Sequence, residues 1–369
     1  NSLKIVVHIT DLSHYLDSFS PIFKEAESRI SSIYSIGNYF PMLPKELSNE
    51  IFSLKAGTQK NVISFFFNLS KHGEWSLLEI DSRRLNVHKN LSYGEANRLI
   101  EDKKDFWDLL NRSCLFSQKN RINNGALNII RKEFEFDIDD PENIKIILLN
   151  RNSPASRIIE EMAISVNSET GKLFQKSSFP GIYRTQSSYE ILEQVEDGTG
   201  YKLEQVRVNP SKLTTIPDKH AGLGCKFYIQ VTSPIRRFSD LIMQLQLKLI
   251  LKNATPLFSE EELIKWSEEI SYRQKKYKRA EIEILNHWKL LFLKQNLDQV
   301  FSAKIKRKMK NGNVEIDILE LELTIASSGL ENSSVGEKIF IKIDHVDTQN
   351  NKIKVQSNKN INEEFSLSK

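Results

Sequence analysis

The chain has 369 residues, of which 39% are hydrophobic and 9% are aromatic. This composition predicts a globular protein with one large core and room for a small second domain, and it excludes a disordered tail. The formal net charge is only +4 at pH 7, which is too mild to indicate nucleic-acid binding by itself. Such a function has to rest on local clusters of basic residues.

The cysteines and histidines give no sign of a disulfide framework or a zinc site. The two cysteines, Cys114 and Cys225, are far apart and belong to no C-x-x-C pair, which is typical of a reducing compartment. The seven histidines show no zinc-binding spacing either. Since no uninterrupted apolar run is long enough to span a bilayer, we expect a soluble, cytoplasmic protein without a membrane partner.

The first part of the chain predicts strands and one helix. Residues 3–9 have the pattern of a strand, and residues 21–29 have a helical pattern. Because that strand begins so close to residue 1, we expect the chain to be a truncated piece of a longer protein. Residues 62–69 and 75–80 flank a Lys-His-Gly-Glu turn and predict a β-hairpin, whose apolar first strand should be buried on both faces.

Two further helices are predicted from their N-terminal caps. Ser92, with Glu95 three residues later, has the pattern of a capping box and predicts a helix to about residue 101. The second helix begins after Ser153, where a proline takes the first helical position. Apolar residues recur there at steps of four and define one face: Ile158, Met162 and Val166.

The most informative segment is residues 232–241, which read Thr-Ser-Pro-Ile-Arg-Arg-Phe-Ser-Asp-Leu. Its serine as a cap, followed by its proline, predicts that a helix begins here with Arg236 and Arg237 in the first turn. Guanidinium groups at a helix N-terminus are suited to bind phosphate, because unpaired N–H groups and the helix dipole favour an anion there. Asp240 lies within one turn and could hold one arginine by an ion pair. A capped surface helix with a salt bridge is the alternative interpretation.

The C-terminal part changes from helical to strand periodicity. A helix is predicted after the arginines, with Leu241, Leu245 and Leu249 along one stripe, and a long charged helix at residues 259–295. Short strands then follow at residues 301–305, 314–318, 321–325, 337–343 and 352–356. Five short strands in such close succession are typical of an OB-fold barrel.

Two basic clusters, at residues 273–279 and 304–310, interleave lysine and arginine with an aromatic or apolar residue. This pattern is suited to a groove that follows a phosphate backbone. A solvated helix face and a hairpin edge are equally good interpretations of these runs. The predicted barrel has no clear cluster of aromatic side chains, so we expect it to bind RNA weakly or mainly through its lysines.

Together with the His-Ala-Gly-Leu-Gly of residues 220–224, the 232–241 segment resembles the signature of the RNase II family of 3′→5′ exoribonucleases. Further strings resemble other segments of the family and follow its order. They are residues 8–15, 39–50, 53–57, 91–96, 124–127, 157–161 and 181–184. An ordered series over most of the chain is far more specific than one string, so the chain is identified as a member of the family.

The resemblance implies an α+β fold, in which an RNB-type mixed sheet packed with helices is followed by a C-terminal OB-fold β-barrel. We place the RNB catalytic domain, without its N-terminal part, at residues 1–297 and the RNA-binding barrel at residues 298–369. The implied activity is hydrolysis of single-stranded RNA to nucleoside monophosphates. Single-stranded RNA is the expected partner, and the expected state is a monomer.

The resemblance also implies roles for individual residues. Arg236 would be the catalytic residue, which binds the scissile phosphate and stabilises developing negative charge. The residues expected to contact RNA are Tyr34, Tyr93, Glu160, His220, Arg237 and Glu281. Tyr34 resembles a tyrosine that closes on the 3′-terminal nucleotide, and Glu160 would accept hydrogen bonds from ribose 2′-OH groups. Structural roles stay open as alternatives: Arg237 as the partner of Asp240, and His220 as a brace of the glycine turn.

The family's chemistry implies Mg²⁺ held by a cluster of aspartates in an Asp-x-Asp-Asp type motif. In relatives this motif lies before the strand that matches residues 3–9. We therefore expect magnesium as the cofactor, with ligands mostly upstream of residue 1 and no metal ligand assigned within the chain. The one similar string, at residues 136–141, comes too late in the sequence, and we expect it to form a turn.

Three positions depart from the family's usual pattern. Ile129 stands where relatives often have a stacking aromatic residue, while Gln186 and Gln244 each replace a usual histidine. These changes favour a divergent branch that acts on a narrower set of RNAs. Two other functions stay open: a catalytically inactive RNA-binding pseudo-nuclease, and a DNA-directed OB protein without a preference for ribose.

Overall fold

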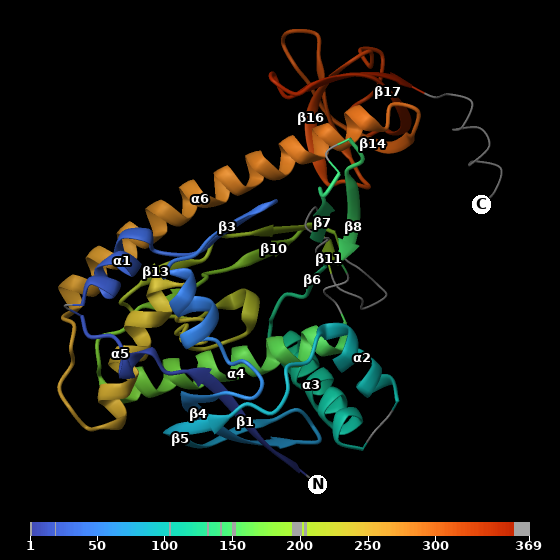
Figure 1. Cartoon of the computed structure of the whole chain (residues 1–369). Helices are drawn as coiled ribbons and strands as arrows, with labels where there is room; N and C mark the ends of the chain where they lie inside the picture. Colours follow the sequence, from blue (N-terminus) through green and yellow to red (C-terminus); the bar gives the residue numbers. More distant parts are fainter. Residues whose placement is uncertain are drawn as a thin grey trace. The chain divides into compact units, whose positions relative to one another are not determined.

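The chain folds into two compact units, which are described separately (Figure 1). The structure is a computed structural model that describes residues 2–18, 20–102, 105–130, 133–140, 142–149, 153–193, 201–202 and 205–357. Unit 1 contains Asn1–Ile33, Phe40–Arg131 and Asn150–Lys276, and unit 2 contains Tyr34–Tyr39, Lys132–Leu149 and Tyr277–Lys369. These two units do not test the domain boundary expected at residue 297, which stays a prediction.

Unit 1 combines helices with short sheets (Figure 1). Its helical elements are η1 (Leu12–His14), α1 (Pro21–Arg29), η2 (Glu46–Ile51), α2 (Tyr93–Glu101), α3 (Asp105–Asn123), α4 (Pro154–Ser177), η4 (Ala221–Leu223), α5 (Phe238–Leu251) and the first part of α6 (Glu260–Gln295). Its strands are β1 (Ser2–Thr10), β4 (Gln59–Ser70), β5 (Trp75–Asn86), β6 (Ile129–Ile130), β9 (Tyr183–Thr185), β10 (Tyr189–Ile191), β11 (Tyr201–Lys202), β12 (Val206–Val208) and β13 (Lys212–Thr214).

The three-stranded sheet of unit 1 has the order β1, β4, β5, and both pairs are antiparallel. The register of β1 on β4 runs from Ser2 opposite Ser70 to Thr10 opposite Val62. Four consecutive residues of β4, 62–65, are all buried. Since successive side chains of a strand point to opposite faces, both faces of this central strand are covered. The predicted first strand and the predicted hairpin are confirmed.

Helix α4 packs against this sheet and joins two apolar clusters. One cluster contains Ile5 and Leu69 of the sheet, Leu110 of α3 and Ile158 of α4. The other is the largest core of the unit and connects β4 and α4 to α5, with Phe67, Val166 and Leu241 among its members. The helix starts predicted from Ser92 and Ser153 are also confirmed, because each serine caps its helix and Ser92 forms the reciprocal capping box with Glu95.

The first turn of α5 differs from the prediction made for the two arginines. Residues 234–236 form a separate turn, in which the Arg237 N–H donates to the Ser233 carbonyl at 3.1 Å. Arg237 is extended (φ −137°, ψ 122°) and α5 begins only at Phe238. The Phe238 N–H donates to the Ile30 carbonyl at 2.8 Å. The predicted helix start was therefore wrong, because a long-range backbone contact interrupts the helical turn and leaves Arg236 and Arg237 before the helix.

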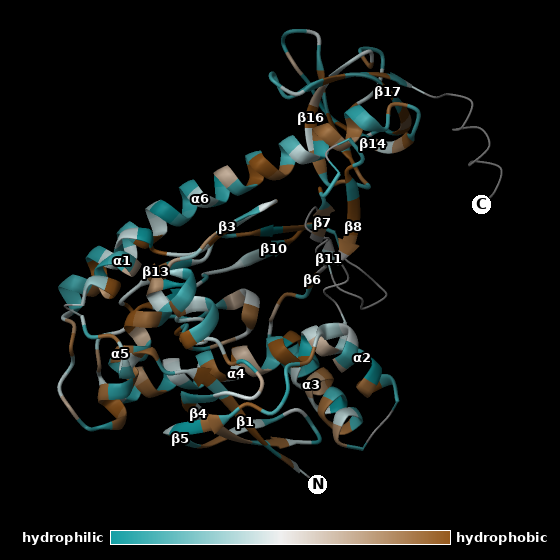
Figure 2. Ribbon diagram, in the orientation of Figure 1, coloured by the Kyte–Doolittle hydropathy of each residue, from teal (hydrophilic) through white to brown (hydrophobic). Residues whose placement is uncertain are grey.

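Helix α6 is long and largely hydrophilic (Figure 2). Three glutamates occupy its first turn, where negative charge favours the positive end of the helix dipole. Its buried side in unit 1 includes Leu263 and Ile270, which belong to the main core. None of the described helices combines the length and the apolar character that a crossing of the bilayer requires.

Unit 2 contains a closed five-stranded barrel with the order β14, β15, β16, β18, β17. The strands of this unit are β2 (Ile33–Ser35), β3 (Asn38–Phe40), β7 (Glu133–Asp137), β8 (Lys145–Leu149), β14 (Val300–Lys308), β15 (Val314–Ile318), β16 (Leu323–Ser328), β17 (Lys338–Asp347) and β18 (Lys352–Ser357). Burial alternates along the barrel strands, as in β15, where residues 314, 316 and 318 are buried. The predicted OB-fold barrel is confirmed.

Within the string at residues 136–141, residues 138–140 follow β7 and lie in the connection to β8, which agrees with the predicted turn. β7 ends at Asp137, whose Oδ1 accepts a hydrogen bond from the Asp139 N–H at 3.3 Å. The Asp140 Oδ1 accepts from the Glu142 N–H at 3.0 Å. Pro141 lies outside the described residues. These aspartates therefore satisfy backbone groups of the turn, as is common for this residue type.

The barrel depends on one glycine at a close backbone approach, which gives a first test of the fold. Gly329 has φ +93°, and a Cβ there would lie 2.1 Å from the Val355 carbonyl oxygen of β18. We expect Gly329→Ala to lower the free energy of unfolding of the barrel by about 3 kcal/mol or more, through backbone strain and steric overlap. Hydrogen exchange of the β16 and β18 amides, together with chemical unfolding, measures this effect.

Gly336 provides the matched control. It has a similar φ of +89°, but nothing lies within 4 Å of its would-be Cβ. Gly336→Ala should therefore cost only the conformational penalty, roughly 1 kcal/mol. Equal losses for the two variants would contradict the proposed overlap with Val355.

Candidate functional site

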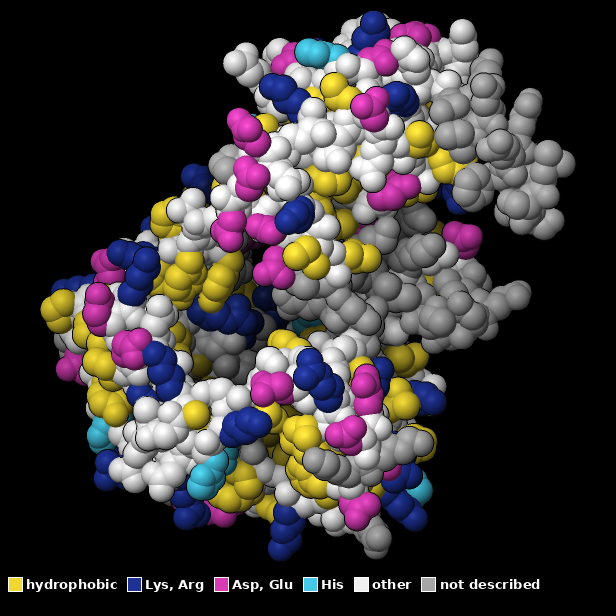
Figure 3. Space-filling model, turned by 45° about the vertical axis from the view of Figure 1, so that its right-hand side comes forward, with side chains coloured by type: hydrophobic (Ala, Val, Ile, Leu, Met, Phe, Trp, Pro, Cys, Tyr) yellow, Lys and Arg dark blue, Asp and Glu magenta, His cyan; other side chains and the backbone are white. Residues whose placement is uncertain are grey.

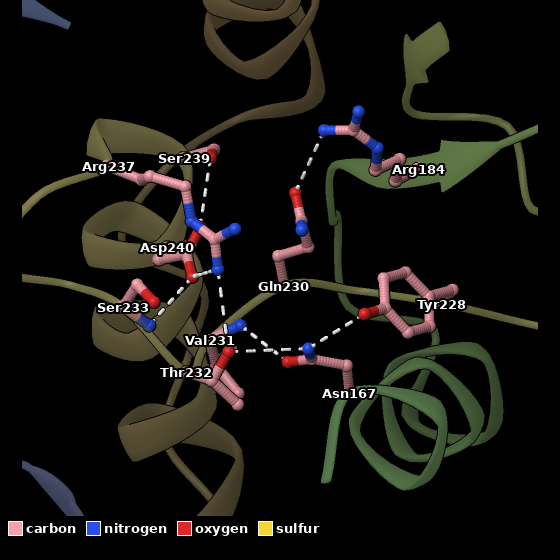
Figure 4. Close-up of polar contacts among 10 residues, drawn as sticks. All are labelled: Asn167, Arg184, Tyr228, Gln230, Val231, Thr232, Ser233, Arg237, Ser239 and Asp240. Carbon is pink, nitrogen blue, oxygen red and sulfur yellow. Dashed lines mark hydrogen bonds and ion pairs between the residues drawn. The ribbon is translucent and has the colours of Figure 1, made fainter. Parts of the chain in front are cut away.

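The segment that carries the two arginines is organised by one fully buried carboxylate, Asp240 (Figure 4). Its Oδ2 accepts hydrogen bonds from Arg237 Nη2 at 2.5 Å and from the Ser233 N–H at 2.9 Å. Its Oδ1 accepts from the Ser239 hydroxyl at 3.1 Å. The predicted ion pair between Asp240 and one of the arginines is confirmed, and its arginine is Arg237.

A buried amide on α4 holds the chain that leads into this segment. Asn167 is 1% exposed, and its Oδ1 accepts from the Val231 N–H at 2.9 Å. Its Nδ2 donates to the Tyr228 hydroxyl at 3.1 Å and to the Thr232 hydroxyl at 3.4 Å (Figure 4). Both ends of the amide are used, so residues 228–232 are fixed to α4 by polar contacts as well as by packing.

A cavity of about 630 Å³ lies within unit 1. Its wall is contributed by α3, α4, β6, β9, β12 and the glycine turn at residues 220–223. Three cationic side chains line it, Lys119, Arg157 and Arg184, against one carboxylate among the described lining residues, Glu160. The volume lies within the range of small-molecule sites, and the surplus of positive charge favours an anionic ligand.

His220 contributes a neutral ring to the cavity wall. The residue is 8% exposed, and its Nδ1 has no hydrogen-bond partner in the described part of the chain. The ring lies against Tyr228, with centroids 5.7 Å apart. Burial, and then the positive charge of Arg184, lower the pKa of His220 to about 4. The imidazole is therefore uncharged at neutral pH and can serve a ligand as a neutral hydrogen-bonding group.

The neighbouring acids Glu160 and Glu161 have different environments. Glu161 is 1% exposed and accepts hydrogen bonds from Ser117 Oγ at 2.6 Å and Arg121 Nε at 3.2 Å. Arg121 also donates to the Leu223 carbonyl at 3.1 Å, which connects α3 and α4 to the glycine turn. Sequence reasoning missed this pair, although Glu161 follows the buried Ile158 by three residues on the same helix face.

Glu160 faces the cavity with 56% of its side chain exposed, and its Oε1 lies 4.0 Å from Arg121 Nη2. Partial desolvation raises the pKa of Glu160 above its ordinary value and outweighs the opposing effect of Arg121. A carboxylate in this position is exposed enough to accept hydrogen bonds from a ligand's hydroxyl groups.

Two of the three unusual residues line the cavity, namely Ile129 and Gln186. Gln186 Oε1 accepts from the Gly222 N–H at 2.9 Å, and Gln186 Nε2 donates to the Asn209 carbonyl at 2.7 Å. A Cβ at Gly222 would lie 2.4 Å from that Oε1, so the glycine permits the close approach. The third, Gln244, has a structural role, because its amide bonds the backbone of Thr10 and Leu12.

The predicted site residues do not all gather at the cavity. Glu160 and His220 line it, whereas Arg236, Arg237 and Tyr93 do not. Arg236 is exposed, and its carbonyl accepts from the Ser32 N–H at 3.0 Å. Tyr93 is the first residue of α2 and is 56% exposed.

The two remaining predicted residues, Tyr34 and Glu281, belong to unit 2. Tyr34 lies in β2, is 54% exposed and stacks on Tyr39 with ring centroids 5.0 Å apart. Glu281 lies on α6, with its Oε2 3.8 Å from Lys278 Nζ. The stacked tyrosines offer an aromatic surface of the kind that accepts a base.

The described residues do not fit a magnesium site. Nowhere among them do three side chains of His, Cys, Asp or Glu lie close enough together to hold a metal ion. Asp240 is committed to Arg237, and Asp11 is paired with Lys248 and caps η1 through Ser13. The carboxylates of Asp240 and Asp11 are therefore used in structural contacts.

The surface carries both signs of charge. On the face shown in Figure 3, Lys and Arg side chains are interspersed with Asp and Glu. This mixture agrees with the small net charge of +4. Anion binding therefore has to come from local groups such as those of the cavity, and long-range attraction by the whole protein is weak.

Comparison with known proteins identifies relatives for most of the chain. The family model for the RNB domain matches residues 1–253. "Ribonuclease II, chloroplastic/mitochondrial" of Arabidopsis thaliana is 24% identical over 357 residues, covering 93% of this chain and 44% of the relative. Overall, the chain spans about half the length of the curated relatives it matches.

Solved structures share the fold. The RNase R of Mycoplasma genitalium in complex with ribose-methylated single-stranded RNA superposes with a TM-score of 0.81 at 18% identity, covering 96% of this chain and 67% of that one. Yeast Ssd1, described as a pseudonuclease, superposes with a TM-score of 0.70 at 15% identity, covering 95% of this chain and 48% of that one. The described architecture thus occurs both in a ribonuclease and in a pseudonuclease.

The buried ion pair gives a second test. Asp240→Asn should lower the free energy of unfolding by about 3 kcal/mol, because it leaves the Arg237 guanidinium without its carboxylate in a largely buried position. Chemical unfolding measures the change. The control is Glu79→Gln, which removes an exposed partner of Arg83 at 3.4 Å and should cost less than about 0.5 kcal/mol. Equal effects would contradict the organising role of Asp240.

His220 predicts a specific pH dependence of stability. Its pKa falls from 6.5 to about 4 on folding, so the folded state disfavours the proton. Stability from this group is complete above the unfolded pKa and is lost as the pH falls toward the folded pKa, by about 2 kcal/mol between neutral pH and about pH 5. Chemical unfolding at both pH values should show a smaller loss for His220→Phe, which keeps a ring against Tyr228. An unchanged pH slope in that variant would contradict the assignment.

Proposed function

The chain belongs to the RNB-domain family, and on that premise we propose that the protein containing it is a 3′→5′ exoribonuclease that hydrolyses single-stranded RNA to nucleoside monophosphates. The observation that carries the proposal is the cationic cavity in the part of the chain that matches the family. Its three cations favour a phosphate backbone, while Glu160 and the neutral His220 provide hydrogen-bonding groups for sugar or base.

In this proposal, Arg236 binds the scissile phosphate and stabilises the charge that develops on it. Arg237 contributes positive charge nearby while it is held by Asp240. Glu160 accepts hydrogen bonds from a ribose 2′-OH, which favours RNA over DNA. Tyr34 and Tyr93 contact terminal bases through their exposed rings. His220 and Glu281 complete the set of RNA contacts.

The metal, the location and the assembly state are part of the same proposal. Mg²⁺ would supply charge neutralisation at the attacking and leaving oxygens, and its ligands are expected outside the residues described. A cytoplasmic monomer with single-stranded RNA as its partner remains our hypothesis. The Arabidopsis thaliana relative is named as a chloroplastic/mitochondrial protein, so an organellar location is the alternative.

A catalytically inactive RNA-binding pseudo-nuclease is the second candidate. It is favoured by the likeness of the fold to yeast Ssd1, which is described as a pseudonuclease. Such a protein would use the same cavity to hold or guide RNA without hydrolysis. The two candidates therefore differ in turnover and agree in RNA binding.

The test is Arg236→Ala in the full protein, with release of nucleoside monophosphates from single-stranded RNA measured in the presence of Mg²⁺. We expect a loss of turnover of roughly 100-fold or more and an RNA affinity within about twofold of the original. The control is Arg112→Ala, an exposed arginine paired with Asp108 at 2.7 Å, which should leave both quantities unchanged.

Each result separates the candidates. Equal turnover in the Arg236→Ala variant and the unaltered protein would remove Arg236 from its proposed role. RNA binding without any release of monophosphates by the unaltered protein would favour the pseudo-nuclease.

A further inference from the structure

Arg184 is a half-buried arginine on β9 with little to neutralise its charge. Its guanidinium makes one hydrogen bond to a neutral group, from Nη1 to Gln230 Oε1 at 3.3 Å (Figure 4). Its backbone N–H donates to the Tyr228 carbonyl at 2.9 Å. Within the described part of the chain, no carboxylate forms an ion pair with it, although other partly buried cations such as Arg121 and Lys248 have one.

The charged group that acts most strongly on Arg184 is another cation. The pKa of the Arg184 guanidinium is lowered, first by burial and then by repulsion from Arg237. Arg237 is itself held by the Asp240 carboxylate, which also accepts hydrogen bonds from the Ser233 N–H and the Ser239 hydroxyl. Asp240 therefore balances the charge of Arg237, while no ion pair among the described residues balances the charge of Arg184.

This unbalanced cation lines the 630 Å³ cavity of unit 1. The same wall contains His220, whose Nδ1 is buried and has no partner among the described residues. Arg157, Lys119 and Glu160 complete the charged lining. A purely structural arginine would be paired within the fold, because burying an unpaired charge is costly. The missing partner is therefore best supplied by a ligand.

We propose that Arg184 is a phosphate-binding residue of this cavity, contacting a backbone phosphate of RNA other than the one assigned to Arg236. This inference rests on the proposed function and adds to it a contact that the motif comparison did not single out. Phosphate suits the site because its oxygens match the planar fork of guanidinium donors. A bound phosphate also neutralises the charge that Asp240 leaves uncompensated.

Arg184→Met tests the proposal, because methionine keeps much of the side-chain length and removes the charge. The unaltered chain and the variant are titrated with a fluorescent single-stranded oligoadenylate over a series of salt concentrations. We expect roughly tenfold weaker binding at low salt. The slope of log affinity against log salt should decrease in magnitude by about 0.7, the value for one phosphate contact on a single strand.

Arg184→Met should weaken RNA binding without lowering the thermal stability of the protein. Since Arg184 carries an unpaired charge into a half-buried position, its removal should leave the Tm of the protein equal or higher. The matched control is Arg207→Met. Arg207 lies on β12, which pairs with β10, and it is exposed and pairs with Glu190 at 2.7 Å. The variant should therefore keep the affinity and salt slope of the unaltered chain.

Several outcomes would overturn the inference. Unchanged affinity and salt slope in Arg184→Met, with RNA binding by the unaltered chain, would refute it and leave the proposed function standing. If Arg184→Met and Arg184→Gln both fail to fold, the side chain is structural and the proposal is wrong. If the unaltered chain binds no oligoribonucleotide even at low salt, this inference fails, and the turnover of the full protein decides the proposed function separately.

Discussion

The buried carboxylate of Asp240 is the interaction on which the candidate site depends. It ends the turn that carries the two arginines by binding the Ser233 N–H and the Arg237 guanidinium at the same oxygen. A charged group with no exposure is tolerated because it is paired with a cation and both of its oxygens accept hydrogen bonds. Because Asp240 is paired with Arg237, Arg184 has no ion-pair partner among the described residues, and its positive charge lies on the cavity wall.

The fold was predictable from sequence wherever the signal was local. Two such signals are the helix caps at Ser92 and Ser153 and the alternation of apolar and polar residues after residue 300. Each depends on neighbours within a few positions, and the structure confirms the helices and the barrel strands that they predict. The start of α5 was not predictable in this way. The serine and proline do form the predicted turn, because the Arg237 N–H donates to the Ser233 carbonyl. The turn does not continue into α5, because the Phe238 N–H donates to the carbonyl of Ile30, which is more than two hundred residues away in sequence.

The site was predictable only in part, for the same reason. Motif strings single out residues by type and order, and two residues chosen in this way, Glu160 and His220, line the cavity in the structure. They do not show which charges are paired, because pairing is set by the tertiary structure. The sequence therefore provided no reason to single out Arg184 within residues 181–184. For Arg237 it left an RNA contact and an ion pair with Asp240 as alternatives, and the structure shows the ion pair.

The closed barrel has a consequence for how unit 2 can meet a partner. Between residues 300 and 357, β17 returns to pair with β14, so every barrel strand has a neighbour on each side. A partner cannot extend this sheet by donating a strand, as it can where a sheet has an open edge. Recognition by the barrel must use side chains and connecting loops, and these can diversify in evolution without disturbing the hydrogen-bond ladder beneath them.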